Sequence, residues 1–327
     1  MQDQFRRPIN YLRISVTDRC NLRCIYCMPP DGVKSFQHAE ILTFEEIIKV
    51  VQAGVRIGIR KIRLTGGEPL IRGGIIDLVD SINNVPEIDD IAITTNGILL
   101  GQMVQQLKKA GLNRVNVSLD TMKPERFKRI TRGGNIDLVW KGLNAAIDAG
   151  LKPVKINTVA IRGFNDDELV DLARLTLEHP LHVRFIELMP IGTSNDAWAR
   201  GKYIASSEVK EMIEGTLGKL VDEKNIHGSG PARYARLPGS KGTIGFISAI
   251  SNHFCAECNR LRLTSTGQLR PCLFNNREID LKQALRGGAG LEDLTRIFRA
   301  AVESKPVGHD LDKAWRQDDR VMSQIGG

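Results

Sequence analysis

Short β-branched runs alternate with helical patterns between residues 10 and 190, and this alternation limits the fold more than any other feature of the sequence. The runs predict strands at 11–17, 61–65, 90–95, 114–119, 153–161 and 182–188. Because a crossover helix separates each strand from the next, the strands are expected to pair in parallel. Periodicity alone does not separate an open doubly wound sheet from a barrel or partial barrel. Both folds place their chemistry at the carboxyl ends of the strands.

Capping signals and a change of pattern define the remaining elements. Thr43 with Glu46 forms a capping box before one helical run, and Asn165 with Glu168 is expected to begin another helix. After about residue 190 the sequence predicts a helix at 206–218, β-like runs at 232–237 and 243–250, a hairpin at 260–273, and helices near 279–286 and 291–304. The hairpin turn is expected at Thr266-Gly267.

All six cysteines fall into two groups of three, namely Cys20, Cys24 and Cys27, and Cys255, Cys258 and Cys272. Three thiolates are one fewer than a closed tetrahedral zinc site needs, and one fewer than a [4Fe–4S] cluster held at every corner. A cluster held by three cysteines leaves one iron open to a further ligand. In the second group a structural zinc remains an alternative, with His253, or more remotely His227, as the fourth ligand.

The composition indicates a folded globular protein, with 42% hydrophobic and 26% charged residues. The formal net charge is +8, but the lysines and arginines are spread along the chain and form no basic tail. The surplus suits a small polyanion such as a nucleoside triphosphate equally well as a nucleic acid. The N-terminus lacks the apolar segment of a secretory signal, and no apolar run approaches the roughly 18 residues of a membrane helix. We therefore expect a cytoplasmic protein.

Several cationic side chains interrupt strands that are otherwise apolar. Arg13 and Lys155 lie in such strands, where a charge is costly unless it is paired, so both are expected to meet a ligand. The same argument applies to Arg184. Beside the second cysteine group, Arg260 and Arg262 share one face of a strand, and two neighbouring guanidinium groups suit a phosphate anion.

The first cysteine group resembles the signature of the radical S-adenosylmethionine enzymes. The resemblance rests on the Cys-x3-Cys-x2-Cys spacing, on Tyr26 before the third cysteine, and on TGGEP one strand–helix unit later. It implies that the three cysteines hold a [4Fe–4S] cluster whose open iron binds S-adenosylmethionine. Cleavage of that cofactor would give a 5′-deoxyadenosyl radical, and the GGE residues would meet its methionine amino group.

From about residue 8 to the end, the chain resembles the GTP 3′,8-cyclase family. The motifs are YLRISVTDRCNLRCIYCMP, LTGGEPL, ITTNG, NVSLD, VKINTV, RFIELMP, FCAECNRLRLTSTGQLRPCLF and a terminal Gly-Gly. The resemblance implies an α/β fold, a partial (β/α)6 TIM-like barrel of the radical S-adenosylmethionine type at 4–220. A C-terminal α+β region at 221–327 would close the open side and carry a second [4Fe–4S] cluster and the Gly-Gly tail.

The same resemblance implies the reaction. The radical would take the 3′ hydrogen of GTP, and the C3′ radical would add to guanine C8. Reduction would then give (8S)-3′,8-cyclo-7,8-dihydroguanosine 5′-triphosphate, the first step of molybdenum cofactor biosynthesis. The implied partners are cyclic pyranopterin monophosphate synthase downstream and an electron donor such as flavodoxin or ferredoxin, with no nucleic acid and no membrane. Monomer and homodimer both stay open.

The resemblance also implies which residues contact the cofactor and the substrate. The resemblance implies S-adenosylmethionine contacts from Tyr26, Gly67, Ser118 and Met189, and GTP contacts from Arg13, Arg63, Thr94, Lys155, Arg260, Leu261 and Arg262. From the residues alone, Ser118 and Thr94 also fit ordinary strand positions, and Met189 fits a core position. Whether Arg270 reaches the substrate stays open. The Gly326-Gly327 tail is implied to enter the active site.

The sequence leaves two rival functions open. One is a peptide-modifying radical S-adenosylmethionine maturase, although such enzymes usually carry more C-terminal cysteines. The other is a nucleic-acid-binding regulator stabilised by zinc at both cysteine groups. About eight irons per chain with sulfide would support two clusters, whereas zinc without sulfide would support the regulator.

Overall fold

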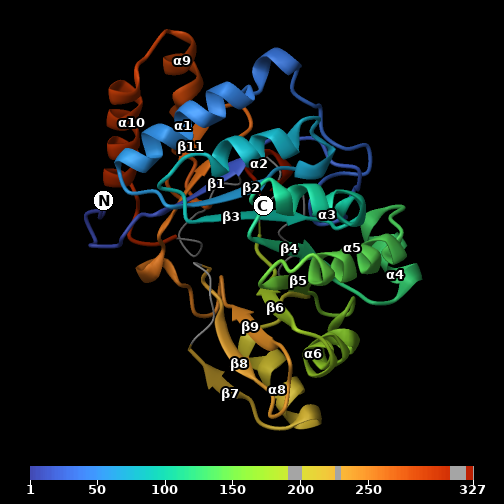
Figure 1. The fold of residues 1–327 in the computed structure, drawn as a ribbon. Helices are drawn as coiled ribbons and strands as arrows, with labels where there is room; N and C mark the ends of the chain where they lie inside the picture. The colour runs from blue at the N-terminus through green and yellow to red at the C-terminus, as the bar shows by residue number, and fades with distance from the viewer. Residues whose placement is uncertain (191–200, 225–229, 310–321, 327) are drawn as a thin grey trace.

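One mixed sheet organises the molecule. The computed structural model describes residues 1–190, 201–224, 230–309 and 322–326. The strands of these residues follow the order β12-β11-β10-β1-β2-β3-β4-β5-β6-β9-β8-β7. Figure 1 shows the curved sheet with α1 to α6 along its outer side.

The six strands expected from the sequence are present and pair in parallel in chain order. They are β1 (Tyr11–Ser15), β2 (Lys61–Thr65), β3 (Asp90–Thr95), β4 (Arg114–Ser118), β5 (Val154–Ala160) and β6 (Leu181–Glu187). Alternate residues of each strand face the outer helices and the inner side, as the pleat requires. On β1, Leu12 and Ile14 belong to the hydrophobic core under the helices, whereas Tyr11 and Arg13 line an inner cavity.

Crossover helices link these strands. They are α1 (Phe44–Arg56), α2 (Ile75–Asn83), α3 (Leu100–Lys109), α4 (Pro124–Thr131), α5 (Ile136–Asp148) and α6 (Leu169–Glu178), with short 3₁₀ turns at His38–Glu40, Pro69–Ile71 and Asp166–Glu168. The capping box of α1 is confirmed, because the Thr43 hydroxyl accepts from the Glu46 N–H at 3.2 Å and Glu46 accepts from the Thr43 N–H at 2.8 Å. Helix α4 was not among the expected elements.

The helical segment expected to begin at Asn165 is present, but the Asn165 side chain does not cap it. This side chain is buried, accepting from the Ile161 N–H and donating to the carbonyls of Asp120 and Val159. A 3₁₀ turn then precedes α6, and the buried Glu168 carboxylate accepts from Thr121 instead. Asn165 therefore ties β5 to the end of β4.

The C-terminal region extends both edges of this sheet. Helix α8 (Ser206–Leu217) precedes this region, whose elements are β7 (Val221–Glu223), β8 (Arg233–Arg236), β9 (Thr243–Ile247), a 3₁₀ turn at Cys255–Glu257, β10 (Arg260–Leu263), β11 (Gln268–Arg270), β12 (Ile279–Asp280), α9 (Leu281–Arg286), α10 (Leu291–Glu303) and α11 (Met322–Ile325). Strand β9 pairs in parallel with β6 at one edge, and β10 pairs in parallel with β1 at the other. The predicted hairpin is β10–β11, with Gly267 in its turn at φ 81°.

The predicted α/β class is confirmed, as a partial barrel rather than a closed one. In the described part of the chain, β7 and β12 end the sheet and do not pair with each other. Helix α10 packs on α1 and α9 (Figure 1), which joins the C-terminal region to the first strand–helix unit. None of the helices described here is long and apolar enough to cross a membrane.

Candidate active site

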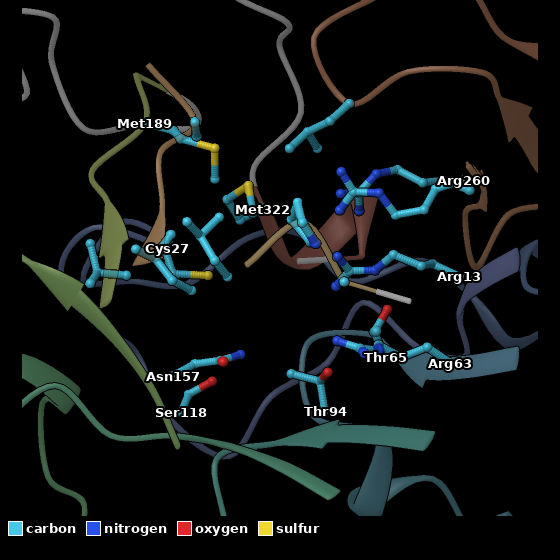
Figure 2. Close-up of a pocket in the computed structure, with 18 of the residues that line it drawn as sticks. Arg13, Cys27, Arg63, Thr65, Thr94, Ser118, Asn157, Met189, Arg260 and Met322 are labelled. Carbon is cyan, nitrogen blue, oxygen red and sulfur yellow. The ribbon is translucent and has the colours of Figure 1, made fainter. Parts of the chain in front are cut away.

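A cavity of about 320 Å³ opens at the carboxyl ends of the parallel strands, and all six cysteines line it. Figure 2 shows Cys27 and Met189 on one side of this cavity and Arg13, Arg63 and Arg260 on the other. Two cysteine groups from opposite ends of the sequence therefore share one chamber. Its volume falls in the range of small-molecule sites.

The first cysteine loop follows β1 and rests on the end of α4. The N–H groups of Arg23 and Ile25 donate to the carbonyls of Thr131 and Ile130 at 3.0 and 2.9 Å. The Arg132 guanidinium donates to the Arg23 carbonyl at 2.9 Å. These contacts hold the loop against the end of α4, and burial raises the pKa values of its three thiols.

The TGGEP loop after β2 presses against the cysteine loop. The Gly67 N–H donates to the Thr17 carbonyl at 2.8 Å, and the Glu68 N–H donates to the Arg19 carbonyl at 2.8 Å. A Cβ atom on Gly67 would lie 2.2 Å from the Arg19 oxygen, far inside contact distance. Glycine is therefore required here by the close approach of two backbones.

Glu68 joins this loop to the end of β3. Its carboxylate accepts from the Leu70 N–H, the Thr95 hydroxyl and the Asn96 N–H at 3.0, 2.8 and 2.7 Å. Burial raises the pKa of Glu68 to about 7, although these donors favour the ionised form. The carboxylate is thus a structural tie between the TGGEP loop and the end of β3.

The half-buried Tyr26 and the buried Asp120 form a pair at the carboxyl end of β4. The Tyr26 hydroxyl donates to Asp120 at 2.7 Å, and the Val159 N–H donates to the other carboxylate oxygen at 2.8 Å. Burial raises the pKa of Asp120 to about 6 and that of Tyr26 well above its usual value. The ring of Tyr26 is therefore held in one orientation beside Cys24.

Polar side chains from three neighbouring strands form one wall of the cavity. Figure 2 shows Thr94 of β3, Ser118 of β4 and Asn157 of β5 lying together along it. Ser118 and Asn157 are direct register partners. Asn157 was missed in the sequence, because an asparagine in a strand carries no signal until its neighbours are known.

Four arginines form the opposite wall, which we call the arginine wall: Arg13, Arg63, Arg260 and Arg262. Arg13 is the register partner of both Arg63 and Arg262, so three strands bring guanidinium groups side by side. Burial and then the neighbouring cations lower the pKa of Arg262 to about 9, and burial lowers that of Arg63 to about 10. Such crowding of like charges favours an anionic ligand.

Three other residues that the sequence indicated as ligand contacts are not part of the arginine wall. Arg184 lines the cavity and donates to Asn116 at 2.6 Å. Lys155 and Leu261 do not line it: the Lys155 ammonium donates to the Tyr234 hydroxyl at 2.8 Å, and the Leu261 side chain is buried in the core. Burial lowers the pKa of Lys155 to about 6, and nearby arginines contribute.

Arg270 also lies outside the cavity lining. It is fully buried and forms an ion pair with Glu278 at 3.1 Å. It also donates to the Asn275 carbonyl at 2.9 Å. These contacts tie the segment after Cys272 to β11, which is a structural explanation for this arginine.

The end of the chain reaches the arginine wall. The Arg262 guanidinium donates to the Gly326 carbonyl. Gly326 has φ 82°, and a Cβ atom on it would lie 2.8 Å from the Thr65 hydroxyl oxygen. Glycine is therefore required at this position, whereas Gly327 lies outside the described residues.

The second cysteine group lies beside cationic side chains. Burial by itself raises the pKa of the Cys258 thiol, but the positive charges of Arg260 and Lys305 outweigh burial. The net effect is a pKa lowered to about 6. The ring of His253 packs on His309 with 4.9 Å between centroids. Among the residues that the structure describes, no three His, Cys, Asp or Glu side chains converge on a single metal ion, whereas His227 lies outside them. All three cysteines of the second group line the cavity, and three thiolates can hold a [4Fe–4S] cluster with one iron left open.

The fold and the two cysteine groups define a radical S-adenosylmethionine protein. A family model described as the radical SAM superfamily matches residues 14–176, and one described as Molybdenum Cofactor Synthesis C matches residues 181–311. A solved structure of Streptococcus suis SuiB bound to precursor peptide SuiA has a TM-score of 0.64. At 14% identity, over 89% of this chain and 64% of that one, it supports the fold alone.

Relatives that match over their full length identify the family within the radical S-adenosylmethionine proteins. The chain is 57% identical to GTP 3′,8-cyclase of Pelotomaculum thermopropionicum and 57% identical to that of Desulforamulus reducens. It is 54% identical to the enzyme of Heliobacterium modesticaldum. Each match covers the whole of both chains. The chain belongs to the GTP 3′,8-cyclase family.

Proposed function

We propose that the chain converts GTP to (8S)-3′,8-cyclo-7,8-dihydroguanosine 5′-triphosphate, the first step of molybdenum cofactor biosynthesis. Its cofactors are two [4Fe–4S] clusters and S-adenosylmethionine. The observation that carries the proposal is a single cavity that joins two three-cysteine groups to the arginine wall. Full-length relatives named GTP 3′,8-cyclase support the same reaction.

The cofactor end of the cavity is the side of Cys20, Cys24 and Cys27. When bound there, the cluster and S-adenosylmethionine supply one-electron reduction and a carbon-centred radical. The chain's own part is placement: we assign the S-adenosylmethionine contacts to Tyr26, Gly67, Ser118 and Met189, all of which line this cavity. Cavity walls that exclude water also protect a radical from side reactions.

The substrate end is the side of the arginine wall. We assign GTP contacts to Arg13, Arg63, Thr94, Arg260 and Arg262, whose side chains line the cavity. Leu261 has its side chain in the core, so only its backbone is available. A GTP contact from Lys155 requires its ammonium to exchange the hydrogen bond with Tyr234. The open iron that three cysteines leave at Cys255, Cys258 and Cys272 would anchor the purine.

Replacing Arg260 by alanine is expected to weaken GTP binding roughly ten- to a hundredfold, because a hydrogen bond to a charged group contributes about 1.5–3 kcal/mol. Iron content should stay unchanged. Isothermal titration of GTP and of guanosine into anaerobic protein measures the effect, and guanosine should bind the unmodified protein more weakly than GTP.

Arg299 on α10 offers a matched control, since it is exposed and outside the cavity lining. Arg299→Ala should bind GTP as the unmodified protein does. Equal affinities for GTP and guanosine in the unmodified protein would contradict a phosphate role for the arginine wall.

We further propose cyclic pyranopterin monophosphate synthase as the enzyme that takes the product, and flavodoxin or ferredoxin as the electron donor, in the cytoplasm. The family resemblance supports both partners. Light scattering of the anaerobic holoprotein would separate the monomer from the homodimer.

A further inference from the structure

Lys305 is a buried lysine that lines the cavity two residues after the end of α10. Its ammonium donates to the Arg260 carbonyl at 2.9 Å and to the Pro271 carbonyl at 2.6 Å. Arg260 follows Cys258 by two residues, and Pro271 immediately precedes Cys272. One side chain thus connects the two segments that carry the second cysteine group.

Lys305 also lies beside the Cys258 side chain, close enough for the two to interact electrostatically. The two carbonyl acceptors hold the nitrogen on its backbone side, and they leave a lysine ammonium one further N–H donor. The geometry therefore holds the Lys305 amino group against a cysteine of the second group.

The backbone around Lys305 is itself held from outside the C-terminal region. The buried Arg7 guanidinium donates to the carbonyls of Pro306 and Val307 at 2.6 and 3.1 Å, and to the Cys255 carbonyl at 2.7 Å. Asp3 orients Arg7 through an ion pair of 2.6 Å. The N-terminal segment therefore fixes the position of Lys305 relative to the cysteines.

We propose that Lys305 is a positioning residue for the second iron–sulfur cluster, which ties its two cysteine-bearing segments together and raises its reduction potential by charge. The inference rests on the proposed function, because it requires an iron–sulfur cluster at Cys255, Cys258 and Cys272. Hydrogen bonds to cluster sulfurs and net charge beside them are established determinants of cluster potential. A nearby cation favours the reduced form because reduction adds negative charge.

Two variants separate the two effects. Lys305→Gln keeps donor groups but loses the charge, so both clusters should remain while the second becomes harder to reduce. We expect about a tenfold shift in its reduction equilibrium, which is about 59 mV for one electron. Lys305→Met loses the donors as well, so the second cluster should be lost and iron should fall from about eight to about four per chain.

The measurements are iron and sulfide content and a potentiometric titration followed by electron paramagnetic resonance, on the full-length anaerobic holoprotein. The first cluster, recognised by its spectral change on addition of S-adenosylmethionine, serves as an internal reference and should keep its potential. Lys282→Met is the matched control, because Lys282 also donates to a carbonyl, that of Glu40 at 3.0 Å, but lies outside the cavity lining.

An unchanged second-cluster potential in Lys305→Gln, or an equal shift in both clusters, would overturn the inference. Weaker GTP binding at an unchanged potential would do the same and make Lys305 a substrate ligand. Retention of eight irons in Lys305→Met would remove the tying role. Zinc in place of iron at the second group of the unmodified protein would instead contradict the cofactor assignment itself, and this is seen before any variant is made.

Discussion

Cys24→Ala is expected to abolish formation of 5′-deoxyadenosine and to lower the iron content from about eight to about four per chain. Cys24 lies at the centre of a loop that the end of α4 holds in place, and its sulfur lines the cavity. Removing it leaves two thiolates for a cluster that needs three. The measurement is iron analysis together with chromatography of 5′-deoxyadenosine after anaerobic reduction with S-adenosylmethionine.

Cys258→Ala is the matched control within the same cavity. It should lose the other cluster and weaken GTP binding, yet still cleave S-adenosylmethionine at least slowly, because the first cysteine loop is untouched. Normal cleavage by Cys24→Ala would contradict the role assigned to the first group. Unchanged GTP affinity in a folded Cys258→Ala variant would make the second group merely structural.

Deleting Gly326 and Gly327 is expected to abolish the cyclised product while leaving both clusters, the fold and GTP binding largely intact. The physical reason is that the Gly326 carbonyl accepts from Arg262, so the end of the chain reaches the cavity and can position the reacting groups, while Arg13, Arg63 and Arg260 still bind GTP. Product formation under single-turnover anaerobic conditions measures the effect, with iron content and GTP affinity determined on the same samples.

Gly326→Ala tests the same contact with a single methyl group. The added Cβ would lie 2.8 Å from the Thr65 hydroxyl oxygen, at a φ of 82° that alanine rarely adopts, so the product should also fall. Cyclisation at the full rate by the truncated protein would show that the end of the chain has no role in the reaction.

Local sequence patterns predicted the six parallel strands well, because β-branched runs and helix caps are short-range signals. The pairing of β9 with β6 and of β10 with β1 could not be predicted, since it joins segments that are distant in the chain. The role of the Asn165 side chain could not be predicted for the same reason. The local sequence indicates a helix cap, but the side chain is buried in tertiary contacts with the carbonyls of Asp120 and Val159.

The site could be predicted where residue type and spacing determine the chemistry. The cysteine groups and Arg260 with Arg262 are of this kind, and the structure brings them to one cavity. Lys155 shows the limit, because a charge in an apolar strand indicates a partner without saying whether it is a ligand or, as here, Tyr234. Lys305 had no signal in the sequence, since its partners are backbone carbonyls.

The most direct test of the proposed function is the fate of the 3′ hydrogen of GTP. Anaerobic holoprotein with S-adenosylmethionine, a reductant and GTP deuterated at C3′ should transfer deuterium to 5′-deoxyadenosine. Mass spectrometry should show one 5′-deoxyadenosine for each 3′,8-cyclo-7,8-dihydroguanosine 5′-triphosphate formed. Formation of 5′-deoxyadenosine without deuterium, or of no cyclised nucleotide, would contradict the proposed reaction.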